Sequence, residues 1–258
     1  MAETIAILSQ KGGTGKTTSV RTLTDVMRRL GLRTLAVDLD PQGNLSDYFD
    51  VDPDAAPTIG DVLTGQAKVA DAIHDDIMPA NLGLAEAELV LSGKMGREMT
   101  LRRALAQLDE GYDIILVDCP PSLGLLTVNA LVAADHALIS AEAQYFALQG
   151  VEQAMEVVDL ARERLNPDLQ LLGVLLNLAD MRTVHSREAL ASLKESFGEK
   201  VFDTVIRSSI AYAESAERGL SILDHRPDLG ADYLALAEEV LARLGLDAAR
   251  ERLPELSA

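Results

Sequence analysis

Residues 9–18 read Ser-Gln-Lys-Gly-Gly-Thr-Gly-Lys-Thr-Thr, and this stretch decides the fold. An apolar segment at 5–8 precedes it and an amphipathic segment follows it, which is the strand, loop and helix order of a P-loop. The stretch fits the pattern G-x-x-x-x-G-K-[ST] in modified form, because Gln10 stands in place of the first glycine. Glycines let backbone N–H groups surround a phosphate, and the helix N-terminus adds partial positive charge. The sequence therefore predicts a phosphate-binding loop at this point.

Two lysines flank the glycines of the loop. Lys16 is placed to reach the β and γ oxygens of a nucleotide, and the Thr17 hydroxyl to complete a Mg²⁺ shell. Lys11 would serve either the same nucleotide or one bound by a neighbouring subunit, as an arginine finger does. A glycine-rich turn without a ligand is the alternative, and the strand before it and the helix after it argue against that. The predicted nucleotide contacts in the loop are Lys11, Gly12, Gly13, Thr14, Gly15, Lys16, Thr17 and Thr18.

Carboxylates follow two further strand-like segments. Asp38 and Asp40 come directly after the run 34–37 and alternate along the chain, so both can face one side, and Asp118 follows the run 114–117. A carboxylate at the carboxyl edge of a strand beside a P-loop is well placed to orient water or Mg²⁺. An ordinary Asp-rich turn is the alternative at 38–40. We predict metal-site roles for Thr17, Asp38 and Asp118, and catalytic roles for Lys11 and Asp40.

The rest of the chain alternates between buried strands and amphipathic helices. Continuous apolar runs are typical of a parallel sheet that is covered on both faces, and crossover helices connect such strands. We expect an α/β fold with a single doubly wound, mostly parallel sheet and helices on both faces, one domain over 1–258 that includes C-terminal helices at roughly 228–253. The expected strands are 5–8, 34–37, 114–117, 136–139 and 172–176, and the expected helices are 16–31, 151–165, 189–197 and 233–244.

Composition excludes several classes of protein. Of the 258 residues, 48% are hydrophobic and 25% are charged, which is close to the globular average and excludes wholesale disorder. The single cysteine, Cys119, can form no internal disulfide and no four-thiolate cluster, so a reducing compartment is expected. No apolar run is long enough for a transmembrane helix, and the N-terminus lacks the basic patch of a signal peptide. We expect a cytoplasmic protein.

Charge is unevenly distributed along the chain. The formal net charge of −18 opposes association with nucleic acid at long range. Between Asp47 and Glu88, Lys68 is the one basic residue, whereas acidic and basic residues balance between Arg182 and Arg226. If the chain contacts a polyanion, we expect this balanced stretch to do so. The candidate DNA contacts in it are Arg182, Arg187, Lys194, Lys200, Arg207 and Arg218.

Three segments together resemble the ParA-type partition ATPases, within the ParA/MinD group of P-loop NTPases with deviant Walker A motifs. They are Lys-Gly-Gly-Thr-Gly-Lys-Thr-Thr at 11–18, Asp-Leu-Asp-Pro-Gln-Gly-Asn at 38–44 and Asp-Cys-Pro-Pro-Ser-Leu-Gly at 118–124, and the spacing matches from residue 3 to 240. The resemblance implies an ATPase that uses ATP and Mg²⁺, forms an ATP-dependent homodimer and hydrolyses slowly alone. It also implies non-specific DNA binding, association with the nucleoid and stimulation by a ParB-type partner.

Individual roles carry over from this resemblance. In that family, the lysine that matches Lys11 reaches the nucleotide of the other subunit, and the aspartate that matches Asp40 is needed for hydrolysis. The residues that match Lys16, Thr17 and Asp118 hold phosphates and Mg²⁺. Asn177 resembles the strand-end residue that contacts adenine, with capping of the next helix as its alternative. Arg207 opens the segment 207–215, where many relatives carry Pro-Arg-Asn-x-Arg-x-Ser-Glu-Ala, and it is a candidate contact for nucleotide as well as DNA.

Other functions on the same scaffold stay open. A MinD-like membrane-positioned ATPase would end in a basic amphipathic helix. Residues 233–258 hold more acidic than basic side chains and no lysine, so we expect no membrane partner. A metabolic ligase or kinase would need a substrate pocket, and no insertion that would build one is evident. Positioning of a protein cargo is a further alternative.

The P-loop prediction has a direct test. Lys16→Ala removes the ammonium that is expected to bind the β and γ oxygens, so nucleotide binding should be abolished. Calorimetric titration with ATP measures this, and normal ATP affinity in the variant would refute the assignment.

Overall fold

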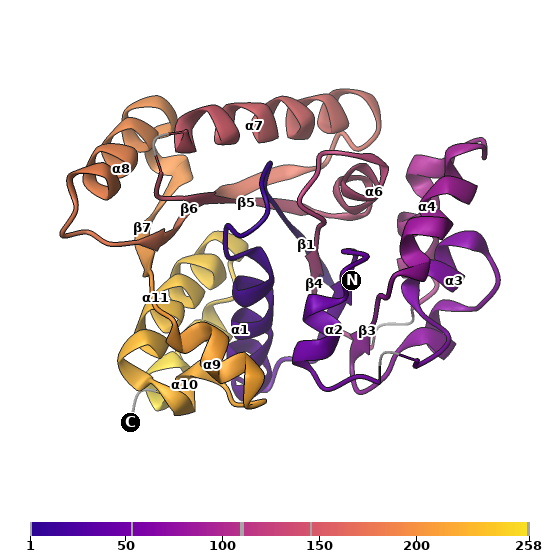
Figure 1. Ribbon diagram of the computed structural model, residues 1–258, viewed down its shortest axis with the longest axis horizontal. Helices are drawn as coiled ribbons and strands as arrows, with labels where there is room; N and C mark the ends of the chain where they lie inside the picture. The colour runs from indigo at the N-terminus through magenta and orange to yellow at the C-terminus, as the bar shows by residue number, and fades with distance from the viewer. Residues whose placement is uncertain (1, 53, 109–110, 145, 257–258) are drawn as a thin grey trace.

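Seven parallel strands form one sheet in the order β3-β2-β4-β1-β5-β6-β7 (Figure 1). This computed structural model describes residues 2–52, 54–108, 111–144 and 146–256. β1 lies in the middle, between β4 and β5. The strands are β1 (Glu3–Leu8), β2 (Thr34–Asp38), β3 (Ile77–Met78), β4 (Ile114–Asp118), β5 (His136–Glu142), β6 (Gln170–Ala179) and β7 (Val201–Arg207).

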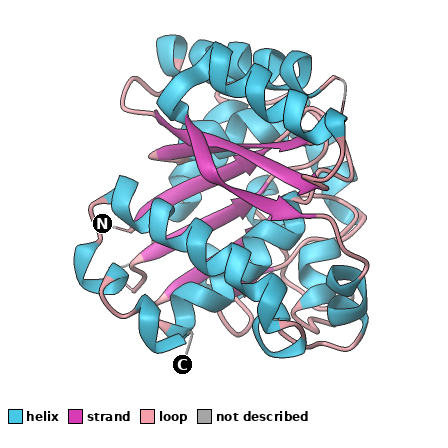
Figure 2. Ribbon diagram, turned by 90° about the vertical axis from the view of Figure 1, so that its left-hand side faces the viewer, coloured by secondary structure: helices cyan, strands magenta, loops and turns pink. Residues whose placement is uncertain are grey.

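Helices lie against both faces of the sheet (Figure 2). Two hydrophobic layers fill the space between the helices and the strands, one on each face. Successive side chains of a strand point to opposite faces, so Ala6 and Leu8 of β1 join one layer while Ile5 and Ile7 join the other. Each layer is closed by helices that bury an apolar stripe against the strands. The need to cover both faces explains why the central strands carry unbroken apolar runs, such as 5–8 and 114–117.

The helices divide between these layers. Buried side chains of one layer come from α3 (Ile59–Thr64), α4 (Gly83–Ser92), α5 (Thr100–Leu105), α6 (Leu125–Ala133), α7 (Ala147–Arg164) and α8 (Val184–Phe197). Those of the other come from α1 (Lys16–Arg29), α2 (Asn44–Tyr48), α9 (Ala211–Glu217), α10 (Ile222–His225), α11 (Pro227–Leu244) and α12 (Asp247–Arg250). Short 3₁₀ helices occupy Val69–Ala72, Arg97–Met99, Gly198–Lys200 and Leu253–Leu256.

All five expected strands and all four expected helices are present, with ends that differ by up to six residues; α11, for example, begins at Pro227 and not at 233. α8 begins earlier than expected, at Val184, because the Thr183 side chain accepts a hydrogen bond from the backbone N–H of Ser186 and caps the helix. Sequence patterns missed β3, which has two residues, and β7. The exposed, charged Asp203 interrupts the apolar run of β7. A charged residue is tolerated there because β7 is an edge strand with solvent-exposed positions.

The fold gathers the loops of interest at one edge. The P-loop follows β1, and the segments that contain Asp40, Pro121 and Ser209 follow β2, β4 and β7, while Leu178 lies at the carboxyl end of β6. In a parallel sheet the carboxyl ends of all strands meet at the same edge. Within the described ranges, none of the helices combines the length and apolar character that crossing a bilayer requires.

Candidate nucleotide site

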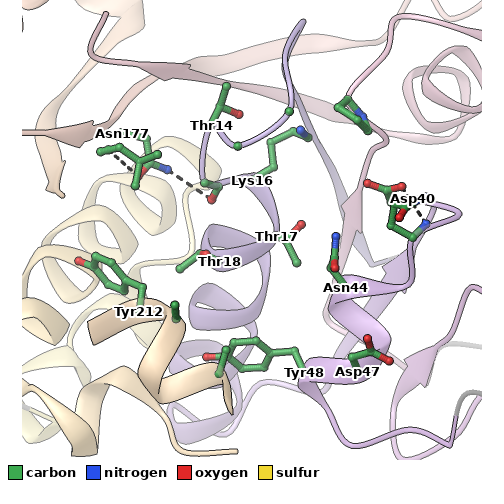
Figure 3. A pocket seen from close by; sticks show the side chains of 18 of the residues that line it. Thr14, Lys16, Thr17, Thr18, Asp40, Asn44, Asp47, Tyr48, Asn177 and Tyr212 are labelled. Atoms are coloured by element: carbon green, nitrogen blue, oxygen red, sulfur yellow. Dashed lines mark hydrogen bonds between the residues drawn. The ribbon is translucent and has the colours of Figure 1, made fainter. Parts of the chain in front are cut away.

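A cleft of about 800 Å³ opens at the carboxyl edge of the sheet (Figure 3). At one end it is lined by Gly12–Thr18 of the P-loop, Asp40 and Pro121. At the other end it is lined by side chains from the β6, α9 and α11 region, including Leu178, Ser209, Tyr212 and Tyr233. The size suits a nucleotide, with phosphates at the glycine end.

The P-loop backbone takes the conformation that its glycines permit. Gly13 and Gly15 have φ of 75° and 80°, which lies in the left-handed region that other residues rarely adopt. Lys16 is buried, and its Nζ donates to Ser9 Oγ at 3.0 Å and to the carbonyl of Lys11 at 3.4 Å. The loop therefore surrounds the Lys16 ammonium group, which is the group expected to bind a phosphate.

Thr17 and Asp118 form a pair suited to magnesium. The Thr17 hydroxyl donates to Asp118 Oδ2 at 2.6 Å, and Thr17 also lines the cleft. Asp118 Oδ1 is buried and has no hydrogen-bond partner among the described residues. Mg²⁺ prefers oxygen ligands and keeps several waters, so a free carboxylate oxygen behind a cleft-facing hydroxyl fits the ion and its hydration shell.

Asp38 lies beside Asp118, because β2 and β4 pair in a register that aligns these two residues. Burial raises the pKa of Asp118, and repulsion from Asp38 raises it further, while the bond from Thr17 opposes the shift. Burial raises the pKa of Asp38 as well, to about 6. Two carboxylates in this environment favour a bound cation or proton.

Asp38, a predicted metal ligand, has both carboxylate oxygens hydrogen-bonded within its own chain. Its Oδ1 accepts the backbone N–H of Asp40 at 3.0 Å, and its Oδ2 accepts the N–H and the hydroxyl of Ser46 at 3.0 and 2.8 Å. Asp38 is fully buried and is not among the described residues that line the cleft. Because both oxygens bind its own loop, Asp38 holds that loop in shape and thereby presents Asp40, which does line the cleft.

Lys11 points away from its own cleft. It is exposed, it does not line the cleft, and its Nζ lies 5.4 Å from the centroid of the Phe146 ring. A cation at this distance from an aromatic face is attracted to the ring. The geometry does not bring Lys11 to the phosphate position of its own chain.

Two predicted nucleotide contacts are hydrogen-bonded within the chain. Asn177 lines the cleft, and its amide nitrogen donates to Ser19 Oγ at 3.0 Å and to the carbonyl of Gly15 at 3.4 Å, so this nitrogen faces the P-loop (Figure 3). Arg207 does not line the cleft among the described residues; its Nε donates to Asp232 Oδ2 at 2.8 Å, and this bond raises its pKa. Capping is not the role of Asn177 either, since Thr183 caps α8.

The candidate DNA contacts lie in two places, near the carboxyl ends of β6 and β7 and near the amino end of β7. Arg182, Arg187, Arg207 and Arg218 lie after the carboxyl ends of β6 and β7, whereas Lys194 and Lys200 lie near the amino end of β7. Several of these cations have carboxylate partners in the same chain: Arg182 with Asp180 at 2.9 Å, Lys194 with Asp203 at 2.7 Å and Arg207 with Asp232 at 2.8 Å. Among the described residues, Arg187, Lys200 and Arg218 form no ion pair with a carboxylate.

Sequence patterns missed the aromatic residues of the cleft. Tyr48, Tyr212 and Tyr233 line it, and Tyr212 packs edge-on against Tyr233 with ring centroids 5.9 Å apart. Tyr233 does fit the apolar stripe of α11, so its periodicity alone indicates a core residue. The tertiary packing of α11 against α1 is what brings it to the nucleotide loop.

The buried carboxylate predicts a pH-dependent stability. A raised pKa means that ionisation of Asp118 costs folding free energy, so the ligand-free protein loses stability as pH rises above the unfolded value of about 4. Asp118→Asn stays neutral, and its melting temperature without Mg²⁺ should exceed that of the wild type by roughly 3–8 °C more at pH 8 than at pH 5.

Scanning calorimetry at both pH values measures this gap. Asp113→Asn is the matched control, because Asp113 pairs with Arg33 and has a lowered pKa, so its effect should not change between pH 5 and pH 8. An equal gap at both pH values for Asp118→Asn would contradict the prediction.

Comparison with known proteins agrees with the geometry of the cleft. A family model described as an AAA domain matches residues 2–171. The chain is 42% identical to the chromosome-partitioning ATPase Soj of Thermus thermophilus over 245 residues, which cover 93% of this chain and 96% of that protein. It is 40% identical to the sporulation initiation inhibitor protein Soj of Bacillus subtilis over 251 residues, covering 94% and 99%.

Solved structures share the fold. The structure of cobyrinic acid a,c-diamide synthase from Mycobacterium smegmatis with bound ADP and magnesium has a TM-score of 0.76 and 39% identity, and the match covers 84% of this chain and 93% of that chain. Identity of this order to the two Soj proteins, over nearly their whole length, shows that the chain belongs to the Soj/ParA family of partition ATPases.

Proposed function

We propose that this protein is an ATP-switched partition ATPase in which two copies close face to face over their nucleotides. The observation that carries the proposal is the position of Lys11, which is exposed at the start of the P-loop and directed away from its own cleft. A cation so placed can serve the triphosphate of a second copy. ATP and Mg²⁺ are the proposed ligands, as in the M. smegmatis structures with ADP or an ATP analogue and magnesium.

Each described group of the cleft has a proposed task. The N–H groups of Gly12–Thr18 and the Lys16 ammonium bind the phosphates, while the Thr17 hydroxyl and Asp118 hold Mg²⁺. The ion would neutralise charge on the transferred phosphoryl group. Asp40, presented by the Asp38–Ser46 contacts, orients the attacking water. Asp40 is a weak base, so hydrolysis by the protein alone should be slow until a ParB-type partner stimulates it.

The dimer switch is tested by Asp40→Ala. Removing the carboxylate should leave ATP binding intact and stop hydrolysis, so the closed dimer should accumulate with Mg²⁺ and ATP. Sedimentation velocity measures the dimer fraction. A variant that stays monomeric at saturating ATP would refute the role of Asp40 in reopening the dimer.

The same measurement with Lys11→Ala should show loss of the ATP-dependent dimer in the Asp40→Ala background. Lys68→Ala removes an equal charge far along the chain and should leave the dimer unchanged. Full ATP-dependent dimerisation of the variant without Lys11 would refute the role of Lys11 in the closed dimer, on which the proposal rests.

We propose that the protein binds DNA non-specifically and is therefore associated with the nucleoid in the cytoplasm. In one copy, carboxylates of the same chain pair with three of the six candidate cations, and the net charge of −18 opposes binding. Dimerisation doubles the number of available cations, so DNA retention should depend on ATP. Affinity that rests on phosphate contacts falls steeply with salt.

DNA retention with ATP and with ADP across a salt series tests this. Arg187→Ala/Arg218→Ala removes two cations without carboxylate partners at the carboxyl edge, and should weaken ATP-dependent retention about tenfold and flatten the salt slope. Lys194→Ala/Lys200→Ala removes the same charge near the amino end of β7 and should have little effect. Retention that ignores the nucleotide, or no retention at low salt, would refute a DNA track.

A second candidate is phosphoryl transfer to a small molecule, which the similarity to the M. smegmatis synthase favours. The two candidates differ in one readout. The readout is release of inorganic phosphate from ATP. A partition ATPase releases phosphate with no added acceptor, whereas an enzyme that transfers the phosphoryl group to a small molecule turns over only when that acceptor is present.

A further inference from the structure

A buried polar network holds the P-loop from behind. Its members are Ser19 of α1, Ser140 of β5, Asn177 of β6 and Tyr233 of α11, each with a relative exposure of 2% or less. Ser19 is the centre of this network. Its hydroxyl accepts from the Asn177 amide at 3.0 Å and lies 3.4 Å from the Tyr233 hydroxyl.

The network binds two consecutive carbonyl groups of the loop. The Ser140 hydroxyl donates to the carbonyl of Thr14 at 2.8 Å. The carbonyl of Gly15 accepts the backbone N–H of Ser19 at 2.9 Å, which is the first hydrogen bond of α1. The same carbonyl also accepts from the Ser19 hydroxyl at 2.9 Å and from the Asn177 amide at 3.4 Å. In a planar trans peptide the carbonyl of one residue and the N–H of the next point in opposite directions. Holding these two carbonyls toward the interior therefore turns the N–H groups of Gly15 and Lys16 toward the cleft.

Asn177 fits Gly15 and no larger residue. A Cβ added at Gly15 would lie 2.6 Å from the amide nitrogen of Asn177 and 2.9 Å from its oxygen. Gly15 also has a φ of 80°, which disfavours other residues. The amide thus packs directly on the peptide that it holds, and both constraints explain the glycine.

The other end of the Asn177 amide is used as well. Its oxygen accepts the N–H of Leu178 at 3.0 Å, and Leu178 has a φ of 54°. A left-handed leucine is rare and is maintained only where the surroundings require it. Leu178 lines the cleft, so one side chain shapes the P-loop with its nitrogen and the opposite wall of the cleft with its oxygen.

We infer that Asn177 is a positioning residue: through Ser19 and the Gly15 carbonyl it aims the P-loop N–H groups at the phosphates, and it does not read the base. This inference rests on the proposed nucleotide site and adds a link that sequence comparison does not supply. The same network connects the nucleotide loop to α11, through Tyr233.

Calorimetric titration with ATP and with GTP tests the inference. Asn177→Ala should lower the affinities for both nucleotides by the same factor, about tenfold, because the phosphates are common to both. The ratio of ATP to GTP affinity should stay as in the wild type. A loss confined to ATP would assign Asn177 to base recognition, and no loss for either would remove its positioning role; each result overturns the inference.

Ser19→Ala keeps the test decisive if Asn177→Ala folds poorly. It removes one hydroxyl and should lower both affinities severalfold with the ratio unchanged. The double variant should be only slightly worse than the poorer single variant, since both residues act on one carbonyl. Additive effects of the two substitutions would show that they do not act through the same contact.

Asn166→Ala is the matched control. Asn166 is also buried, and its amide donates to the carbonyls of Leu131 and Ala134 at 3.0 and 2.7 Å, which are remote from the P-loop. It should lower the melting temperature but leave both affinities unchanged. Wild-type protein that binds no ATP would refute the proposed function itself, whereas normal wild-type binding with a changed ATP to GTP ratio in Asn177→Ala would refute the inference alone.

Discussion

The direction of a few peptide groups in the P-loop is the constraint on which the site depends. Phosphate binding needs several N–H groups that converge on one point, and each such N–H commits the preceding carbonyl to the interior. There the Ser140 hydroxyl satisfies the carbonyl of Thr14, while the carbonyl of Gly15 accepts the backbone N–H and the hydroxyl of Ser19 and the Asn177 amide. A buried carbonyl without a partner would cost free energy, so the loop and its support form one unit.

The same edge of the sheet concentrates negative charge that a ligand must balance. Asp38 and Asp118 are adjacent because β2 and β4 are paired, and both side chains are fully buried in the ligand-free protein. Lys16 lies close enough to lower the pKa of Asp118, but burial and Asp38 outweigh it. The ligand-free protein therefore carries an electrostatic cost that a magnesium nucleotide would relieve.

Particular residues show how far sequence reasoning reached. The P-loop, the central strands and the cleft position of Asp40 followed from local patterns, because a strand, a glycine-rich turn and a helix are consecutive in the chain. Asp38 was assigned to metal since it alternates with Asp40, yet its Oδ1 accepts the N–H of Asp40 and its Oδ2 accepts from Ser46, eight residues later in the chain. β7 escaped detection because an edge strand with exposed positions lacks the continuous apolar run of a central strand.

The sequence by itself determined the family, the fold class and the identity of the phosphate loop, since these depend on residues that are neighbours along the chain. Only the tertiary structure decided which side chains stand behind that loop, where Lys11 points, and which cations remain without a carboxylate partner. Those outcomes depend on contacts such as Asn177 with Ser19 and Arg207 with Asp232. Residues so paired are brought together by strand order and helix packing, which no local pattern encodes.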